Sequence, residues 1–163
     1  MFNLSPVPVP DLSGKTILVT GAGKGIGAEL VRTLAAHGAR VFAGVYSTDM
    51  LADFPTGVTV LPLDVTSQAD VDAAVRQISE AGGRLDVLVN NAGIIAPIGH
   101  LFTIPSDALT PAFAVNVIGV HRMVLAFLPL LRASMGLIII AVTVAATTQL
   151  EGWVAYCSSK AAM

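Results

Sequence analysis

Short apolar runs rich in β-branched residues alternate along this chain with longer segments of helical periodicity. Such alternation is typical of β-α-β units, in which helices cover both faces of a parallel sheet. Because crossovers between parallel strands are right-handed, it predicts an open, doubly wound α/β sheet of the Rossmann type, with ligands at the carboxyl ends of the strands. The strands are expected at residues 15–20, 40–46, 58–63, 85–90 and 137–143.

Three helices are expected between these strands. The second begins after Ser67, which forms a variant capping box with Asp70. The third covers about residues 110–132, and Pro129 is expected to kink it or end it early. The first covers about residues 25–37, and its apolar positions are spaced to face the sheet: Ile26, Leu30, Leu34 and Ala35.

The composition favours one domain that binds small molecules. The chain has 163 residues, of which 54% are hydrophobic and only 12% charged, as expected where elements are buried on both faces. A net charge of −2 with no basic cluster provides no electrostatic footprint for nucleic acid or an anionic membrane. Residues 1–11 are rich in proline and predict an extended arm, and residues 12–163 predict a single domain.

The sequence predicts a cytoplasmic protein without a membrane span or a metal site. Residues 1–11 lack the positive charge that begins a signal peptide, and the single cysteine, Cys157, suits a reducing compartment. The uncharged run 133–150 has the length to cross a bilayer, but it includes Gly136 and Gln149, so a buried strand with its loop is expected instead. The histidines are too scattered for a metal site: His37, His100 and His121.

A glycine-rich turn follows the first predicted strand and leads into the first predicted helix: Thr20-Gly21-Ala22-Gly23-Lys24-Gly25-Ile26-Gly27. Glycines let a backbone turn tightly and approach a ligand closely, while the N–H groups and partial positive charge of a helix start favour an anion. The turn therefore predicts binding of a dinucleotide through its pyrophosphate. Two registers fit, Gly21-x-x-x-Gly25-x-Gly27 and Gly23-x-Gly25-x-x-Ala28, and both would hold a pyrophosphate.

A phenol and an ammonium group stand four residues apart at Tyr156 and Lys160, on one face if this segment is helical. A tyrosine is a poor base at neutral pH, and a lysine cation beside it favours the phenolate. The pair therefore fits a proton-transfer site. Because it fits a solvated helix face at least as well, the spacing alone leaves both interpretations open.

Three motifs occur in order along the chain: Thr20-Gly21-x-x-x-Gly25-Ile26-Gly27, Asn90-Asn91-Ala92-Gly93 and Tyr156-x-x-x-Lys160. With them the chain resembles the classical short-chain dehydrogenase/reductase family from about residue 12 to residue 163. The resemblance implies an NAD(P)-dependent short-chain alcohol dehydrogenase or carbonyl reductase. Such an enzyme transfers a hydride between a nicotinamide cofactor and a small alcohol, ketone or aldehyde.

The resemblance also implies catalytic roles. Tyr156 would act as general acid/base on the substrate oxygen, and Lys160 would favour its phenolate and hydrogen-bond the nicotinamide ribose. Asn116 would hold a water in the proton relay, and a solvent-facing helix residue is the alternative. Thr143 stands where the family usually has a serine, and its hydroxyl could still donate to the substrate, although its methyl group narrows the pocket. An ordinary strand residue is the alternative for Thr143.

For the cofactor, the resemblance implies three groups of contacts. The pyrophosphate would lie on the turn, at Gly21, Gly23, Lys24, Gly25, Ile26 and Gly27. The adenine would lie against Asp64 and Val65, unless Asp64 only starts a loop. The ribose side would meet Asn91, Ala92, Gly93, Tyr156 and Lys160.

The end of the second predicted strand bears on the choice between NAD and NADP. An acidic side chain there would bind the ribose 2′-OH of NAD, but the residues are Val45, Tyr46 and Ser47. No carboxylate among them repels a 2′-phosphate, and Lys24 in the glycine turn can attract one. We therefore expect NADP rather than NAD, although no arginine stands beside Tyr46.

The chain ends three residues after Lys160, whereas members of the family usually continue with further strands and a substrate loop. We therefore expect a fold truncated after the fifth strand and the start of the following helix, in a fragment of a longer enzyme. Strand 137–143 would be an apolar sheet edge, and the chain alone would be poorly soluble or catalytically weak. The full-length protein would form a homodimer or homotetramer. The alternative function is a nucleotide-binding regulatory or scaffold protein that kept the fold and lost the chemistry.

Overall fold

Five parallel strands form one sheet in the computed structural model, which describes residues 10–47 and 53–163. Most of the predicted arm, residues 1–9, lies outside the described residues. The order across the sheet is β3-β2-β1-β4-β5, so the direction of winding changes between β1 and β4, where doubly wound sheets bind their ligands. In chain order the strands are β1 (Thr16–Thr20), β2 (Arg40–Val45), β3 (Thr59–Pro62), β4 (Val87–Asn90) and β5 (Leu137–Ile140).

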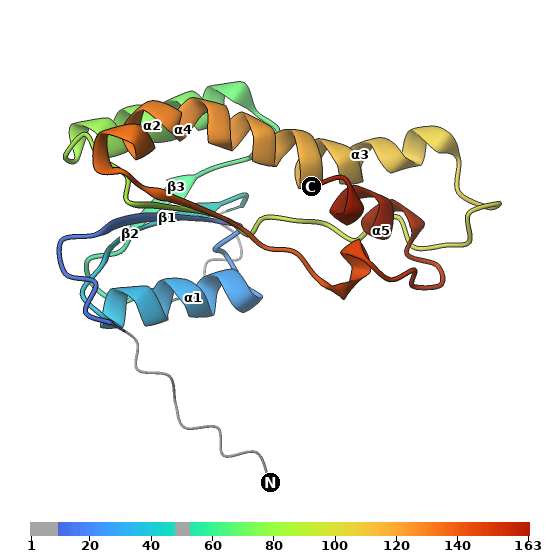
Figure 1. Cartoon of the computed structure of the whole chain (residues 1–163), viewed down its shortest axis with the longest axis horizontal. Coiled ribbons are helices and arrows are strands. Elements are labelled where there is room, and N and C mark those ends of the chain that lie inside the picture. The colour runs from blue at the N-terminus through green and yellow to red at the C-terminus, as the bar shows by residue number, and fades with distance from the viewer. Residues whose placement is uncertain (1–9, 48–52) are drawn as a thin grey trace, which may run out of the picture.

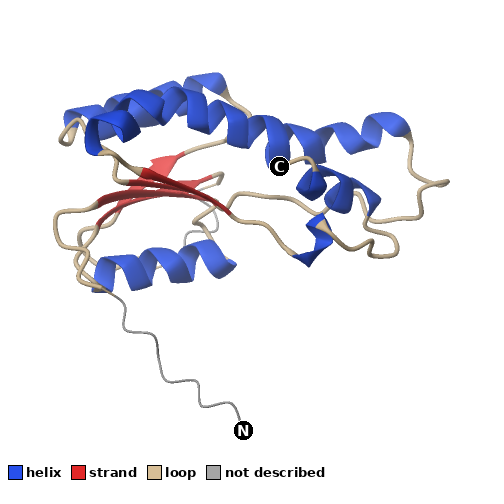
Figure 2. Cartoon of the chain, viewed as in Figure 1, coloured by secondary structure: helices blue, strands red, loops and turns tan. Residues whose placement is uncertain are grey.

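Helices cover both faces of this sheet (Figure 1 and Figure 2). Helix α1 (Gly25–Ala36) lies on one face, and α2 (Gln68–Glu80) and α4 (Val120–Ser134) lie on the other. The short helix α3 (Thr110–Phe113) precedes α4, and α5 (Val154–Ala161) lies beyond the carboxyl ends of the strands (Figure 1). The structure is therefore the doubly wound α/β fold that the sequence predicts.

The residues of β1 divide between two hydrophobic cores, one on each face of the sheet. Ile17 and Val19 pack on the α1 side, where Val31 of that helix is fully buried. Leu18 packs on the other side, in the core that includes Phe127 of α4. Because both faces are covered, all five residues of β1 are buried, and the three central ones form an apolar run between two threonines.

The apolar stripe of α1 differs from the predicted one at its first position. Leu30 and Leu34 pack against the core as expected, but Ile26 is 81% exposed. Gly27 and Ala28 are buried in the first turn of the helix instead. A Cβ at position 27 would already collide with the preceding glycine turn, so a large side chain has no room on that face.

Pro129 does not end the long helix early, because α4 continues to Ser134. The carbonyl group of Leu125 loses its helical partner to the proline, but Leu125 is 57% exposed and water can satisfy it. At the end of the helix, the Ser134 hydroxyl and the N–H of Gly136 donate to the carbonyl oxygen of Leu131, at 3.1 and 2.7 Å. These bonds close the helix in the usual C-terminal manner.

The uncharged run 133–150 is not one helix: it contains the end of α4, all of β5 and a 3-10 turn (Val144–Ala146). A different stretch, the helix Ser106–Ser134, is long and apolar enough to cross a membrane by length and composition. Its part in α4 buries three large side chains in the core, and 28% of its most apolar window is buried inside the structure. These side chains belong to Met123, Phe127 and Leu131.

Strand β5 forms one edge of the described sheet, as expected, and ends at residue 140 rather than 143. It is not the buried strand expected for run 133–150, because three of its four residues are exposed: Leu137, Ile139 and Ile140. Its backbone pairs with β4 on one side. An apolar edge of this kind is a template for further strand pairing.

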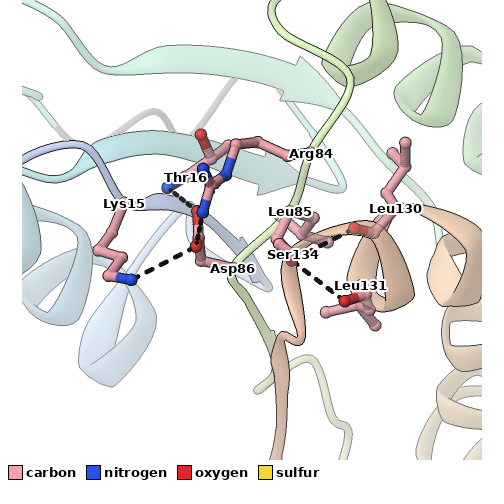
Figure 3. A network of polar contacts seen from close by, with 8 residues as sticks. All are labelled: Lys15, Thr16, Arg84, Leu85, Asp86, Leu130, Leu131 and Ser134. Carbon is pink, nitrogen blue, oxygen red and sulfur yellow. Dashed lines mark hydrogen bonds and ion pairs between the residues drawn. The ribbon is translucent and has the colours of Figure 1, made fainter.

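One buried carboxylate joins β1 and β4 near their amino ends (Figure 3). Asp86 accepts a hydrogen bond from the N–H of Thr16 at 2.9 Å and pairs with the charged groups of Arg84 and Lys15. Burial raises the pKa of Asp86, but the hydrogen bonds from Arg84 and Thr16 and the charges of Arg84 and Lys15 outweigh it, so the pKa lies below its ordinary value. The ionised carboxylate therefore stabilises the fold.

Replacing Asp86 with asparagine is expected to lower the free energy of unfolding by about 1–3 kcal/mol, because a buried acceptor of charged hydrogen bonds loses its charge. The wild-type contribution is present above the pKa of an unfolded aspartate and is lost as the pH falls through the lower folded value. Urea unfolding at neutral and acidic pH measures both effects. The same change at the exposed Asp72 on α2 is the control, and equal stability of Asp86→Asn and wild type at neutral pH contradicts this account.

Candidate active site

Three glycines shape the turn between β1 and α1. Gly21 has a φ of +65°, and a Cβ there would lie 2.7 Å from the Cα of Ala92. Gly25 has a φ of +56° with open space around it, and a Cβ on Gly27 would collide with the carbonyl oxygen of Gly21. The backbone therefore favours glycine at Gly25 and leaves no room for a Cβ at Gly21 and Gly27, which are the three positions of the first predicted register.

Hydrogen bonds join this turn to the segment that follows β4. The hydroxyl of Thr20 accepts from the backbone N–H groups of Asn91 and Ala92, each at 3.0 Å. In return, the side-chain amide of Asn91 donates to the carbonyl oxygens of Thr20 and Gly21, at 3.0 and 3.2 Å. The carboxyl ends of β1 and β4 are thus fixed to each other at the point where the winding of the sheet reverses.

The start of α1 has no side-chain cap. Its N-cap residue, Lys24, has an extended backbone, and its side chain makes no capping hydrogen bond. The first N–H groups of a helix lack partners within the helix, and the helix dipole places partial positive charge there. This helix start, next to the glycine turn, therefore suits a phosphate group.

A cleft of about 810 Å³ lies at this place. Its walls come from the glycine turn, the end of β2 and the segments that follow β3 and β4. Most of the residues predicted to bind a cofactor line this cleft: Gly21, Gly23, Lys24, Ile26, Gly27, Tyr46, Asp64, Val65, Asn91, Ala92 and Gly93. The remaining three, Gly25, Tyr156 and Lys160, do not line it.

Asp64 both lines the cleft and starts a turn. Its Oδ1 accepts from the N–H and the hydroxyl of Thr66, at 2.8 and 2.7 Å. Its own N–H donates to Oδ2 of Asp70 at 3.0 Å. The loop-starting role considered from the sequence is therefore present, and it fixes the carboxylate at the wall of the cleft.

Helix α5 carries Tyr156 and Lys160 one turn apart, with the lysine Nζ 5.8 Å from the centre of the tyrosine ring. Lys160 is 5% exposed, so it does not lie on a solvated helix face, and it donates to the carbonyl oxygen of Ala141 at 2.8 Å. Burial lowers the pKa of Lys160 below its ordinary value, because the charged form is desolvated. The ring of Trp153 meets the Tyr156 ring edge-on, with centroids 5.8 Å apart.

Asn116 is fully buried in a π-helical segment (Ala114–Gly119) between α3 and α4. Its Oδ1 accepts from the N–H of Ile94 at 2.9 Å, and its Nδ2 donates to the Ile94 carbonyl at 2.9 Å and to the Ser159 hydroxyl at 2.8 Å. The solvent-facing alternative for Asn116 is therefore wrong. Single π turns inside helices are frequent at functional sites, and the sequence did not reveal this one.

Asn116 and Lys160 meet at Gly93, a residue that lines the cleft. A Cβ on Gly93 would lie 3.3 Å from Oδ1 of Asn116 and 3.7 Å from Nζ of Lys160. Two of the predicted catalytic residues are therefore next to the predicted cofactor residues. The cleft and the polar groups around α5 are therefore adjacent at Gly93.

Thr143 lies on the connection between β5 and α5, two residues beyond Ala141. It is exposed, and its hydroxyl oxygen accepts from the N–H of Ala145 at 3.1 Å, which starts a 3-10 turn. The alternative of an ordinary strand residue is wrong, since β5 ends at Ile140. Within residues 10–47 and 53–163, no hydrogen bond joins this hydroxyl to Tyr156, and its proton can still be donated.

Three contributors to the polar groups around α5 were not predicted from the sequence. Ile94 and Ala141 take part through backbone groups, which every residue type offers and which therefore leave no pattern in a sequence. Ser159 takes part through its hydroxyl, which contacts Asn116. The one available signal was its position directly before Lys160, and that position also suits a small helix residue with no such role.

The fold and this geometry define a doubly wound α/β domain with a glycine turn at its switch point. Residues 15–163 match the family described as short chain dehydrogenase, so the chain belongs to this family of oxidoreductases. It is 40% identical over 138 residues to the short chain dehydrogenase/reductase dpchH of Colletotrichum higginsianum, covering 77% of this chain and 34% of that protein. It is 38% identical over 124 residues to the oxidoreductase UcpA of Escherichia coli (strain K12), covering 72% and 47%.

Solved structures show the same fold. The KRED1-Pglu enzyme superposes with a TM-score of 0.86 at 30% identity, covering 91% of this chain and 64% of that one. A short chain dehydrogenase from Burkholderia cenocepacia J2315 in complex with NADP has a TM-score of 0.83 at 31% identity, covering 93% and 63%. A 3-ketoacyl-(acyl-carrier-protein) reductase from Brucella melitensis, complexed with NADH, has a TM-score of 0.84 at 26% identity. The chain thus spans about a third to two thirds of the length of these five proteins.

Alanine is expected to be more damaging at Gly21 than at Gly25. A left-handed φ costs an L-residue about 1–2 kcal/mol at either position. Only at Gly21 would the added Cβ also press on backbone, at the Cα of Ala92, whereas Gly25 has open space. Chemical unfolding should therefore show the larger loss of stability for Gly21→Ala, and equal losses would contradict the close approach of the two turns.

Proposed function

We propose that the protein transfers a hydride between a nicotinamide cofactor held in the cleft and an alcohol or carbonyl substrate, with Tyr156 as general acid/base. The observation that carries the proposal is the meeting of Asn116 and Lys160 at Gly93, where the cleft adjoins the helix that bears Tyr156. Membership of an oxidoreductase family supports the same class of reaction. The proposal concerns the activity of the whole protein, since the chain covers part of the length of its relatives.

The residues of the cleft fit a dinucleotide. The glycine turn leaves space that a Cβ would fill, and the uncapped start of α1 adjoins it. In this proposal the pyrophosphate lies on the turn from Gly21 to Gly27, the adenine beside Asp64 and Val65, and the ribose side along residues 91–93. A bound nicotinamide ring would supply or accept the hydride. Complexes of similar proteins with NADP and with NADH support this class of cofactor.

The other polar groups prepare Tyr156 for proton exchange. Lys160 donates one of its three N–H bonds to Ala141, which leaves two for the ribose hydroxyls. Its charge lies 5.8 Å from the centre of the tyrosine ring, and burial reduces the screening of that charge by water. The Thr143 hydroxyl donates to the substrate oxygen in this scheme. Because both amide protons of Asn116 are donated to protein groups, a relay water would bind to its backbone carbonyl or to the remaining lone pair of Oδ1.

The preferred cofactor in this proposal is NADP. Lys24, Tyr46 and Ser47 line the same cleft, and neither residue at the end of β2 carries a carboxylate that would repel a 2′-phosphate. Lys24 supplies a positive charge in the glycine turn. Electrostatic attraction of one lysine for a phosphate is the physical basis of the preference.

The assembly and the location are also proposals. Helix α4 and the π segment before it leave Leu125 and Ile118 more than half exposed, which suits a homodimer or homotetramer formed through this surface. A cytoplasmic location agrees with the single cysteine, whose thiol is reduced in that compartment.

Replacing Tyr156 with phenylalanine removes the hydroxyl and keeps the ring. We expect the loss of general acid/base catalysis to lower turnover about 10²- to 10⁴-fold, while the affinity for the cofactor stays within about twofold of wild type. Loss of NADPH absorbance with a panel of small ketones and aldehydes measures turnover, and nucleotide fluorescence measures affinity. Undiminished turnover in the variant would show that the phenol has no catalytic role, as in a scaffold protein.

Replacing Lys24 with alanine tests the preference for NADP. We expect the dissociation constant of NADP to rise about tenfold, because one charged contact with the 2′-phosphate is lost, while that of NAD, which lacks this phosphate, changes little. Titration of each cofactor at low salt measures both constants. Added salt screens the charge of Lys24 and should reduce the difference between wild type and Lys24→Ala in the dissociation constant of NADP. Equal losses for the two cofactors would contradict a contact between Lys24 and the 2′-phosphate.

A further inference from the structure

Helix α5 is attached to the rest of the site by a buried hydroxyl for which the proposed reaction has no use. Ser159 is fully buried. Its Oγ accepts a hydrogen bond from Nδ2 of Asn116 at 2.8 Å and donates one to the carbonyl oxygen of Tyr156 at 2.9 Å. We call these two hydrogen bonds the Ser159 link.

We propose that Ser159 is a positioning residue, which sets the place of Tyr156 and Lys160 relative to the cofactor cleft by attaching α5 to Asn116. The inference rests on the proposed function and adds to it a residue that touches neither substrate nor cofactor. It would act through Tyr156, whose carbonyl oxygen it binds, and through Lys160, the next residue of the helix.

The Ser159 link connects α5 to the wall of the cleft through the side chain of Asn116. Asn116 binds both the N–H and the carbonyl of Ile94, so its amide group is fixed to the segment that follows β4. Ile94 itself lines the cleft, next to Gly93. The path from the cleft wall to the carbonyl of Tyr156 therefore consists of two side chains and four hydrogen bonds, all at 2.8–2.9 Å.

Helix α5 needs such attachments because it is short. It has eight residues, and its N-cap residue, Trp153, makes no side-chain capping hydrogen bond. A helix of this length is not stable by itself, so tertiary contacts must fix its position. Lys160 binds the carbonyl of Ala141 after β5, whereas Ser159 binds Asn116 in the π segment. Adjacent residues thus anchor the helix to two different parts of the molecule.

Loss of the hydroxyl changes the site in a definite way. With alanine at Ser159, one N–H of the buried Asn116 amide has no acceptor, and the carbonyl of Tyr156 loses a donor. A buried donor without a partner is unfavourable, so Asn116 must turn or α5 must shift. Either movement alters the approach of Lys160 and Asn116 to Gly93, while the glycine turn remains as it is.

The test compares wild type with Ser159→Ala, Ser159→Cys and the matched control Ser158→Ala, which removes a hydroxyl from the exposed neighbouring position of the same helix. For each protein we would measure kcat and KM with NADPH and a carbonyl substrate, the dissociation constant of NADPH, and Tm. We expect Ser159→Ala to lower kcat about ten- to hundredfold, because small misplacements of catalytic groups have effects of this size. Its dissociation constant for NADPH should rise by no more than about fivefold, less than kcat falls, since the glycine turn is intact and only the ribose contact of Lys160 is disturbed. Ser159→Cys, with a weaker hydrogen-bonding group, should fall between, and Ser158→Ala should match wild type.

The outcomes separate positioning from general stability. A merely structural role would lower Tm and weaken cofactor binding by as large a factor as it lowers kcat, and that result, or a kcat for Ser159→Ala within twofold of wild type, overturns the inference. If Ser159→Ala does not fold, Ser159→Cys decides: a fall in kcat larger than the loss of cofactor affinity supports the inference, and a wild-type kcat or an equal loss of both overturns it. All variants are made in the full-length protein, and absence of turnover in the full-length wild type rejects the proposed function, and the inference with it, before any variant is compared.

Discussion

Two backbone turns touch at the centre of this fold, where Gly21 lies against Ala92 with no side chain between them. The first turn leaves β1 and the second leaves β4, the two strands between which the winding of the sheet reverses. The Thr20 hydroxyl and the Asn91 amide close the contact with four hydrogen bonds. This contact lies at the wall of the cleft, because Gly21 and Ala92 both line it. The absence of a side chain at Gly21 lets a ligand approach the backbone there closely.

The contact also determines the position of the polar groups that lie farther along the chain. The segment after Ala92 continues to Gly93 and Ile94, and the backbone of Ile94 holds the Asn116 amide. Asn116 in turn holds Ser159, the neighbour of Lys160. Groups far apart in the sequence are thus connected by short hydrogen bonds to one rigid point. Preorganisation of this kind is what an active site needs, since catalytic groups must be in place before the substrate arrives.

The sequence predicted the fold well because its strongest signals are physical necessities of that fold. The centre of a strand such as β1, buried on both faces, must be apolar, as at residues 17–19, and a turn with left-handed backbone favours glycine, as at Gly21. Predictions were wrong where one residue was judged without its neighbours in space. Ile26 followed the helical period but stands beside Gly27, where the glycine turn leaves no room for packing. Pro129 lacks a donor, but the carbonyl that it deprives belongs to an exposed residue.

The predicted site residues lie where the topology should bring them, but the contacts that place them could not be predicted. The π segment around Asn116 is accompanied by hydrogen bonds to the backbone of Ile94, which no residue pattern records. The burial of Ser159 depends on the packing of α5. Spacing of Tyr156 and Lys160 predicts a shared helix face, but not that Ala141 would hold the ammonium group. Long-range backbone partners become visible only in three dimensions.

The hydrogen bond from Lys160 to Ala141 makes the position of the ammonium group depend on the edge of the sheet. Ala141 directly follows β5, whose backbone pairs with β4 on one side of the described sheet. The ammonium group is therefore tethered to the border of the sheet rather than to its centre. Any segment that paired with β5 would cover the exposed apolar strand that leads directly to the acceptor of this ammonium group.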